Sequence, residues 1–235
     1  MSTSTMHTTS TPRRLSALGV AFLGTGAILA LTLLIKQQTN EEVGRYFLYQ
    51  VIALLVAVAV VQVVRLITGA GLPRWGDLSA PSRRMRLLGV AEGESWKRIG
   101  VTFAIIISAV TALFLGIGYW DQITQLRWGA WAIAFIIAIP LSMTNALTEE
   151  LITRWAIVAA FSGLWARYAP WASALLFGGV HWFGIPGGPI GALMAGFLAW
   201  LLTRSIQDTK GIGWAWIIHF CQDMLIFTVT IALFV

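Results

Sequence analysis

Charged residues are scarce in this chain of 235 residues. Asp, Glu, Lys and Arg make up 11% of it, hydrophobic residues make up 57%, and the mean hydropathy is +0.77. A soluble globular domain carries about 25% charged residues, so this composition excludes one. Cysteine is nearly absent as well. Cys221 is the only one, which excludes an intramolecular disulfide and leaves a small, apolar side chain within a hydrophobic run.

Long hydrophobic runs take the place of the missing charge. Runs at 15–35, 47–67 and 100–120 can each cross about 30 Å of hydrocarbon as a helix, and four more can be drawn between 128 and 235. Spans must be helical because hydrocarbon satisfies no backbone polar group. The first run is too long for a signal-peptide core and lacks a small-residue cleavage pattern, so we expect it to be retained. The sequence predicts an all-α, multi-pass transmembrane helical bundle of about seven spans.

The cations predict the orientation of the bundle. The net charge is +6, yet the cations are not gathered into one basic face, so nucleic acid is not expected as a partner. With a cytoplasmic N-terminus, three cations lie outside and twelve lie at cytoplasmic ends, as the positive-inside rule requires. The three are Lys36, Arg45 and Arg127; the twelve are Arg13, Arg14, Arg65, Arg74, Arg83, Arg84, Arg86, Lys97, Arg98, Arg167, Arg204 and Lys210. We therefore expect an integral protein of the cell membrane.

Three regions follow from these spans. Residues 1–14 are expected to be a disordered cytoplasmic tail, and 15–127 a three-span region with a basic cytoplasmic loop at 68–99, close to anionic lipid headgroups. Residues 128–235 form the core that carries the polar residues. Within it, 129–165 is too long for one ordinary span, so Pro140 is expected to start or kink the helix, with the span proper over 141–165.

A few ionisable residues lie within the apolar runs. They are Glu149, Glu150 and Asp223, with His181 and His219, the two histidines outside the tail. A central Asp, Lys or Arg costs roughly 2.5–3.5 kcal/mol on insertion scales, so such groups persist where they pair, relay protons or catalyse. Their occurrence on separate segments predicts an intramembrane polar cavity.

Spacing suggests different roles for the two glutamates. Glu150 and Arg154 are at i and i+4, which favours an ion pair with a structural role. Neighbours on a helix are rotated by about 100°, so Glu149 is expected to point elsewhere. With a neighbouring imidazole, it could deprotonate a water molecule. The alternative is a hydrogen bond that serves only helix packing.

The histidines allow the same two interpretations. His181 ends the run from Phe177, in which Gly178 and Gly179 let another helix approach the backbone closely. His181 is expected at the depth of Glu149. His219 and Asp223 are at i and i+4, a spacing that suits a His–carboxylate hydrogen bond or a shared ligand. Each feature alone is more often structural than catalytic, and their convergence favours a site.

These motifs resemble those of a known family. Residues 149–154 resemble the EExxxR motif, Phe177 to His181 the FxxxH motif, and His219 to Asp223 the HxxxN/D motif of the CPBP intramembrane proteases, also called the CAAX prenyl endopeptidase type II or Abi family. The resemblance covers about residues 129–235. It implies an all-helical endopeptidase in which Glu149 and His181 activate water.

By the same resemblance, His219 and position 223 stabilise the oxyanion. Glu150, Arg154 and Phe177 are expected to support the site. Two departures matter. Trp155 replaces a glycine of many members, and Asp223 replaces the asparagine of the eukaryotic branch. An ionised Asp has no hydrogen to donate, so Asp223 is expected either to be protonated or to hold the His219 tautomer.

The sequence leaves open whether the reaction needs a metal ion. Glu149, His181, His219 and Asp223 form a nitrogen and oxygen set that could hold Zn²⁺. No HExxH motif is present, and the resemblance also supports a metal-free mechanism, which we expect, with Zn²⁺ as the alternative.

The predicted function is hydrolysis of a peptide bond in a substrate presented within the bilayer, either CAAX processing or peptide and bacteriocin-related processing. The partners expected are a peptide or protein substrate, with or without a lipid group, and membrane lipids. The alternative is a non-enzymatic membrane protein, either an immunity or binding partner or a proton-coupled transporter.

Overall fold

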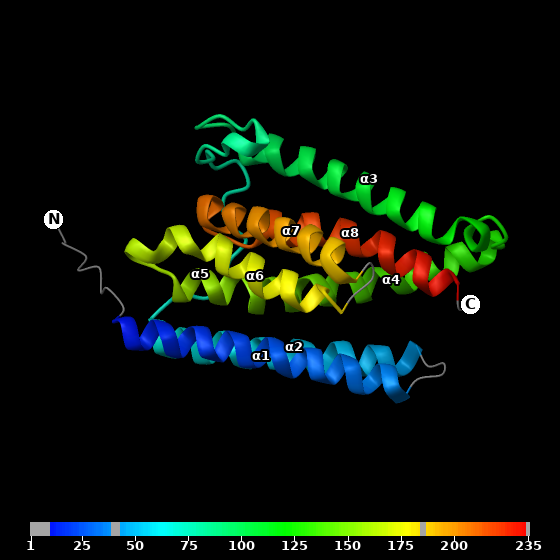
Figure 1. Ribbon diagram of the computed structural model, residues 1–235, viewed down its shortest axis with the longest axis horizontal. Helices are drawn as coiled ribbons and strands as arrows, with labels where there is room; N and C mark the ends of the chain where they lie inside the picture. The colour runs from blue at the N-terminus through cyan, green and yellow to red at the C-terminus, as the bar shows by residue number, and fades with distance from the viewer. Residues whose placement is uncertain (1–9, 39–42, 184–186, 234–235) are drawn as a thin grey trace. The chain divides into compact units, whose positions relative to one another are not determined.

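The computed structural model describes residues 10–38, 43–183 and 187–233, and most of these are helical (Figure 1). The helices are α1 (Thr11–Gln38), α2 (Val43–Thr68), α3 (Trp96–Ile123), α4 (Trp128–Glu149), α5 (Ala156–Ala160), α6 (Ala169–His181), α7 (Gly188–Thr209) and α8 (Gly213–Ala232). A π-helical segment, Glu150–Trp155, joins α4 to α5. Short 3₁₀ turns lie at Arg86–Leu88 and Gly163–Tyr168.

The prediction of a helical membrane bundle is confirmed. In the described part of the chain, six helices are long and apolar enough to cross a membrane, and the three N-terminal runs lie in three of them. The remaining predicted span corresponds to α6, whose 13 residues rise roughly 20 Å. α6 is therefore shorter than an ordinary span. Helix α1 begins at Thr11, so 11–14 of the predicted tail are helical, and residues 1–9 lie outside the described part.

The prediction for Pro140 is wrong in one respect, because no helix starts there. Residues Trp128–Ala160 form one candidate span of 33 residues, and Pro140 lies inside α4. Proline is tolerated inside membrane helices, and α4 continues through Pro140 to Glu149. The helix ends at Ala160, five residues earlier than predicted. Residues 155–160 therefore continue the helix of Glu149 and do not begin another crossing.

The chain divides into two compact units that interleave along the sequence. The first comprises residues 1–38, 55–73 and 151–204, and the second 39–54, 74–150 and 205–235. In the first unit, α5 packs against α1 and α6. Gly178 of α6 meets α7 closely, because a Cβ there would lie 2.6 Å from the Ala192 carbonyl oxygen. This confirms the expected close approach at Gly178, whereas Gly179 faces open space.

In the second unit, α8 packs along both α3 and α4 (Figure 1). The alanines Ala134 and Ala138 of α4 are buried together with Leu141 in a cluster with Ile231 and Ala232 of α8. On the other side, Gly100 of α3 receives the indole ring of Trp214. Helix α8 is thus held between two partners, and the polar residues at its centre are held with it.

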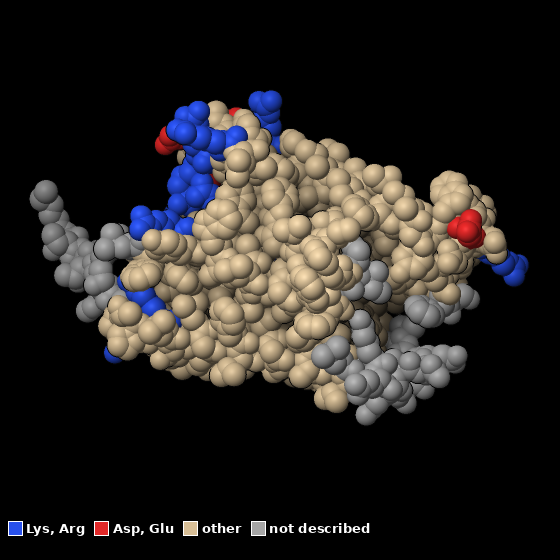
Figure 2. All heavy atoms as spheres, viewed as in Figure 1, with Lys and Arg blue, Asp and Glu red and all other residues tan. Residues whose placement is uncertain are grey.

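A loop of the second unit ties α3 to the turn before α8. Asp208, whose side chain is 2% exposed, accepts hydrogen bonds from Arg83 Nε at 2.6 Å and from Trp96 Nε1 at 3.0 Å. Figure 2 shows Lys and Arg side chains gathered over the loop that leads into α3. This is the basic loop predicted at 68–99.

Candidate functional site

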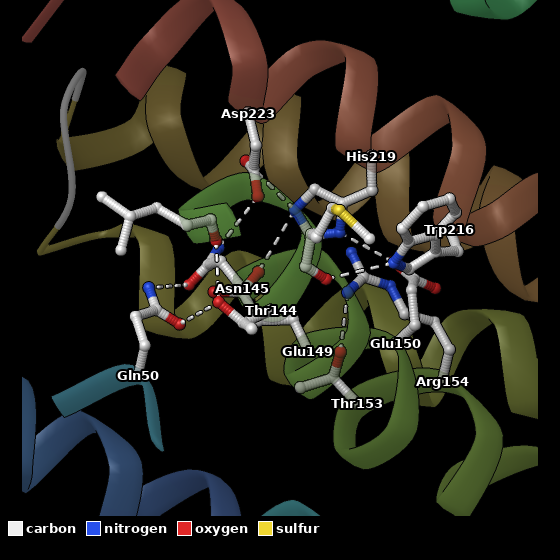
Figure 3. A network of polar contacts seen from close by, with 12 residues as sticks. Gln50, Thr144, Asn145, Glu149, Glu150, Thr153, Arg154, Trp216, His219 and Asp223 are labelled. Carbon is white, nitrogen blue, oxygen red and sulfur yellow. Dashed lines mark hydrogen bonds and ion pairs between the residues drawn. The ribbon is translucent and has the colours of Figure 1, made fainter. Parts of the chain in front are cut away.

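Helices α4 and α8 bring four predicted site residues together. His219 Nδ1 lies 2.8 Å from Glu150 Oε1, and His219 Nε2 lies 3.3 Å from Glu149 Oε2 and 3.6 Å from Asp223 Oδ1. Figure 3 shows the three carboxylates around the imidazole of His219. His219 and Asp223 thus face each other at i,i+4, at a distance longer than a hydrogen bond.

The prediction that the two glutamates point to separate places is wrong. They reach opposite nitrogens of one imidazole ring. Glu149 is the last residue of α4 and Glu150 the first of the π-helical segment. A ring whose two nitrogens face opposite ways accommodates neighbours that are rotated by about 100°. Such π turns occur frequently at functional sites.

Exposure separates the two glutamates where direction does not. The Glu149 side chain is 26% exposed and that of Glu150 is 0% exposed. Glu149 can therefore meet a water molecule or a substrate. Glu150 is enclosed and serves His219, because its carboxylate accepts the Nδ1–H and so fixes the orientation of the ring.

The cluster requires a shared proton. With Nδ1–H donated to Glu150, a neutral His219 would turn the lone pair of Nε2 toward oxygens of Glu149 and Asp223. Lone pairs that face one another repel, so a proton belongs between Nε2 and these carboxyl groups, either on the ring or on an oxygen. The arrangement is suited to general acid–base chemistry.

Two further polar residues extend the cluster, and sequence reasoning missed both. Asn145 Nδ2 donates to Asp223 Oδ2 at 3.0 Å, and Asn145 Oδ1 accepts from Gln50 Nε2 at 3.3 Å. A signal for Asn145 was present, since it lies four residues before Glu149 on the same helix face. For Gln50 the sequence contains no such signal, because it shows only a single amide in an apolar run.

The other predicted residues belong to the first unit. Arg154 is fully buried, with its guanidinium carbon 3.8 Å from the centroid of the Phe177 ring and its Nη1 donating to Thr153 Oγ1 at 2.9 Å. The Thr153 carbonyl accepts from the Ser173 hydroxyl at 2.6 Å, which anchors the π-helical segment to α6. Phe177 thus supports Arg154 directly. The ion pair between Glu150 and Arg154 stays a prediction.

His181 is the last residue of α6 and packs on Phe177, with ring centroids 4.1 Å apart. Its Nδ1 lies 2.9 Å from the Phe177 carbonyl oxygen. A carbonyl only accepts, so Nδ1 carries the hydrogen and Nε2 of the neutral ring is an acceptor. This tautomer suits a base. The pairing of His181 with Glu149 stays a prediction.

The fit of a metal ion can be tested on these contacts. Among the residues that the structure describes, no group of three or more His, Cys, Asp and Glu side chains is arranged to hold a metal ion. In the second unit, Nδ1 of His219 is already engaged by Glu150. Because no such group is found, no metal site is assigned to these residues.

Fold and site together define a class of protein. A helical membrane bundle that encloses an imidazole among three carboxyl groups, one of them accessible, has the groups of an intramembrane acid–base enzyme.

The comparison with protein families narrows this class. Residues 130–225 match the family model described as type II CAAX prenyl endopeptidase Rce1-like. All three motifs lie inside that stretch, so the match supports the resemblance to the CPBP/CAAX proteases. The comparisons with curated proteins and with solved structures gave no match.

Proposed function

We propose that this chain is an intramembrane endopeptidase that hydrolyses a peptide bond with a water molecule activated by Glu149. The observation that carries the proposal is the contact of the accessible Glu149 carboxylate with Nε2 of the buried His219, within a stretch that matches a protease family. The accessible group is the one able to meet water. The enclosed group only orients the imidazole.

The proposed reaction begins with a proton transfer from water to Glu149. The water oxygen forms a bond to the carbonyl carbon of the substrate, and the oxyanion accepts a hydrogen bond from His219 Nε2–H. The C–N bond then breaks, and the amine leaves with the proton that Glu149 held. His181, whose Nε2 is an acceptor, is proposed to share in water activation, a role that rests on the family resemblance.

The reaction is proposed to need no metal. The support for this is that no group of three or more potential ligand side chains is arranged to hold an ion among the described residues. Zn²⁺ is the alternative that elemental analysis tests.

A prenylated CAAX peptide is the first substrate to test, because the matching family is described as a prenyl endopeptidase. An unmodified peptide of the same sequence shows whether the lipid contributes to recognition. Peptides without a CAAX end test the wider alternative of peptide processing.

The deciding experiment compares the wild type with Glu149→Gln on such peptides in detergent. Glu92→Gln is the matched control, since Glu92 is an exposed residue of the loop before α3. We expect cleavage by the wild type and the control and none by Glu149→Gln. Equal cleavage by all three would remove Glu149 from the mechanism, and no cleavage by any would favour the immunity-protein or transporter alternative.

A further inference from the structure

Asn145 and Gln50 form a hydrogen-bonded chain that ends at the proposed catalytic cluster (Figure 3). Gln50 Nε2 donates to Asn145 Oδ1 at 3.3 Å, and Asn145 Nδ2 donates to Asp223 Oδ2 at 3.0 Å. The other oxygen of Asp223, Oδ1, lies 3.6 Å from His219 Nε2. The chain therefore runs from α2 through α4 to the nitrogen of α8 that faces Glu149.

The direction of this chain is fixed by chemistry. A carboxylate only accepts hydrogen bonds, so Asn145 must turn its NH₂ group toward Asp223 and its oxygen toward Gln50. Gln50 is 2% exposed and Asp223 is 5% exposed, so water cannot readily replace either partner. A buried amide held from both sides has one orientation.

We propose that Asn145 is a positioning residue that holds the Asp223 carboxylate toward His219 Nε2, and that Gln50 fixes the Asn145 amide for this task. The inference rests on the proposed function and deepens it. Asn145 touches none of the reacting atoms in this scheme and acts through Asp223.

The proposal assigns Asp223 a role that differs from that of an asparagine. A side chain that accepts from Asn145 with one oxygen and faces an imidazole nitrogen with the other is an acceptor at both ends. Asp223 then balances the proton on His219, and the hydrogen bond to the oxyanion comes from His219. Asn145 supplies an amide donor, which Asp223 lacks because an ionised carboxylate has no hydrogen to donate.

Thr230 offers a control on α8, the helix of Asp223. Its hydroxyl donates to the Ile226 carbonyl at 2.8 Å and to the Phe227 carbonyl at 3.3 Å, both within its own helix. Thr230→Val removes a hydroxyl from this helix without touching the chain of Gln50, Asn145 and Asp223.

The test measures kcat and KM for a cleavable peptide with the wild type, Asn145→Leu, Asn145→Gln and Thr230→Val. Loss of a group that orients a functional side chain typically costs about 10–100-fold in activity. We expect Asn145→Leu to lower kcat by about this factor with KM within about twofold of the wild type. Asn145→Gln, which keeps an amide, should lie between Asn145→Leu and the wild type, and Thr230→Val should match the wild type.

A double-mutant cycle separates positioning from a general effect on packing. In the Asp223→Ala background, Asn145→Leu should lower kcat no further, because the residue through which Asn145 acts is already missing. Multiplicative losses would overturn the proposal, as would an unchanged kcat in Asn145→Leu. If Asn145→Leu does not fold, Gln50→Leu takes its place in both measurements, with a smaller expected loss of kcat and the same absence of effect in the Asp223→Ala background. An unchanged kcat in Gln50→Leu would then overturn the proposal.

Failure of this inference is distinct from failure of the proposed function. A wild type that cleaves no peptide refutes the proposed function and this inference with it. A wild type that cleaves, with Glu149→Gln inactive and Asn145→Leu fully active, refutes only the positioning role.

Discussion

At the scale of single residues, exposure decides which glutamate does chemistry. Glu149 and Glu150 contact the same ring, yet only Glu149 has an accessible side chain. The sequence could predict that their roles differ, from the rotation between neighbours on a helix. It could not predict that both face His219, because that contact depends on the packing of α8 against α4.

The first prediction concerns the proposed base and its partner. Glu149→Gln and His181→Ala should each lower kcat by at least about 100-fold, because general acid–base groups contribute about 10²–10⁴-fold. The melting temperature in detergent should change little, since Glu149 is partly exposed and His181 lies at a helix end. Substantial turnover by either variant would remove that residue from the reaction.

The second prediction concerns the buried polar residues that support the site. Glu150→Ala leaves the Nδ1–H of His219 without its acceptor, and Arg154→Ala removes a cation packed on Phe177. Breaking a buried charge pair costs about 3–5 kcal/mol, so both variants should melt well below the wild type.

A cycle of these variants tests the predicted ion pair between Glu150 and Arg154. If the two side chains pair, the double variant should lose less stability than the sum of the single losses. Strictly additive losses would show that each residue acts through other partners, His219 for Glu150 and Phe177 for Arg154. Arg154→Lys serves as a control for charge alone, because lysine keeps the charge without the planar group that stacks on the ring.

At the scale of helices, hydropathy and spacing located most elements. The runs at 15–35, 47–67 and 100–120 lie within α1, α2 and α3. The π-helical segment could not be predicted, because one wider turn leaves no pattern in the sequence. Asn145 and Gln50 were missed for a related reason. The role of a single amide in an apolar helix depends on its hydrogen-bond partner, and the sequence does not show which residue that is.

The third prediction concerns the contact between α6 and α7. A methyl group at Gly178 would lie 2.6 Å from the Ala192 carbonyl oxygen, whereas one at Gly179 would meet nothing within 4 Å. Overpacking costs about 1–3 kcal/mol, so Gly178→Ala should lower the melting temperature. Gly179→Ala is the matched control and should be neutral or slightly stabilising, because alanine favours a helix over glycine by about 1 kcal/mol. Equal behaviour of the two variants would contradict the close approach at Gly178.

At the scale of the whole molecule, the fourth prediction concerns the metal. Protein purified without chelators should contain well under one Zn²⁺ per chain by elemental analysis and should keep its activity after treatment with 1,10-phenanthroline. The reason is that, among the described residues, no group of three or more potential ligand side chains is arranged to hold an ion. One bound ion per chain, with activity lost on chelation and restored by Zn²⁺, would establish the metal-dependent alternative.

The last prediction concerns topology, which decides the side from which a substrate approaches. The positive-inside rule places the basic loop before α3 in the cytoplasm and the far end of α3 outside. The 28 residues of α3 rise about 42 Å, enough to separate its ends by a bilayer. Single cysteines at Glu92 and Gln122, both exposed, in a Cys221→Ser background should label oppositely with an impermeant maleimide. Gln122→Cys should react in intact cells, and Glu92→Cys only after permeabilisation.

A tag fused after Val235 completes this test, because it reports whether α6 crosses the membrane. Seven crossings with a cytoplasmic N-terminus put the tag outside the cell, which is the result we expect from the sequence. A tag in the cytoplasm would mean an even number of crossings, with the 13-residue α6 not spanning the bilayer. Labelling of Glu92→Cys in intact cells would instead reverse the whole orientation, because the basic loop and the far end of α3 would exchange sides.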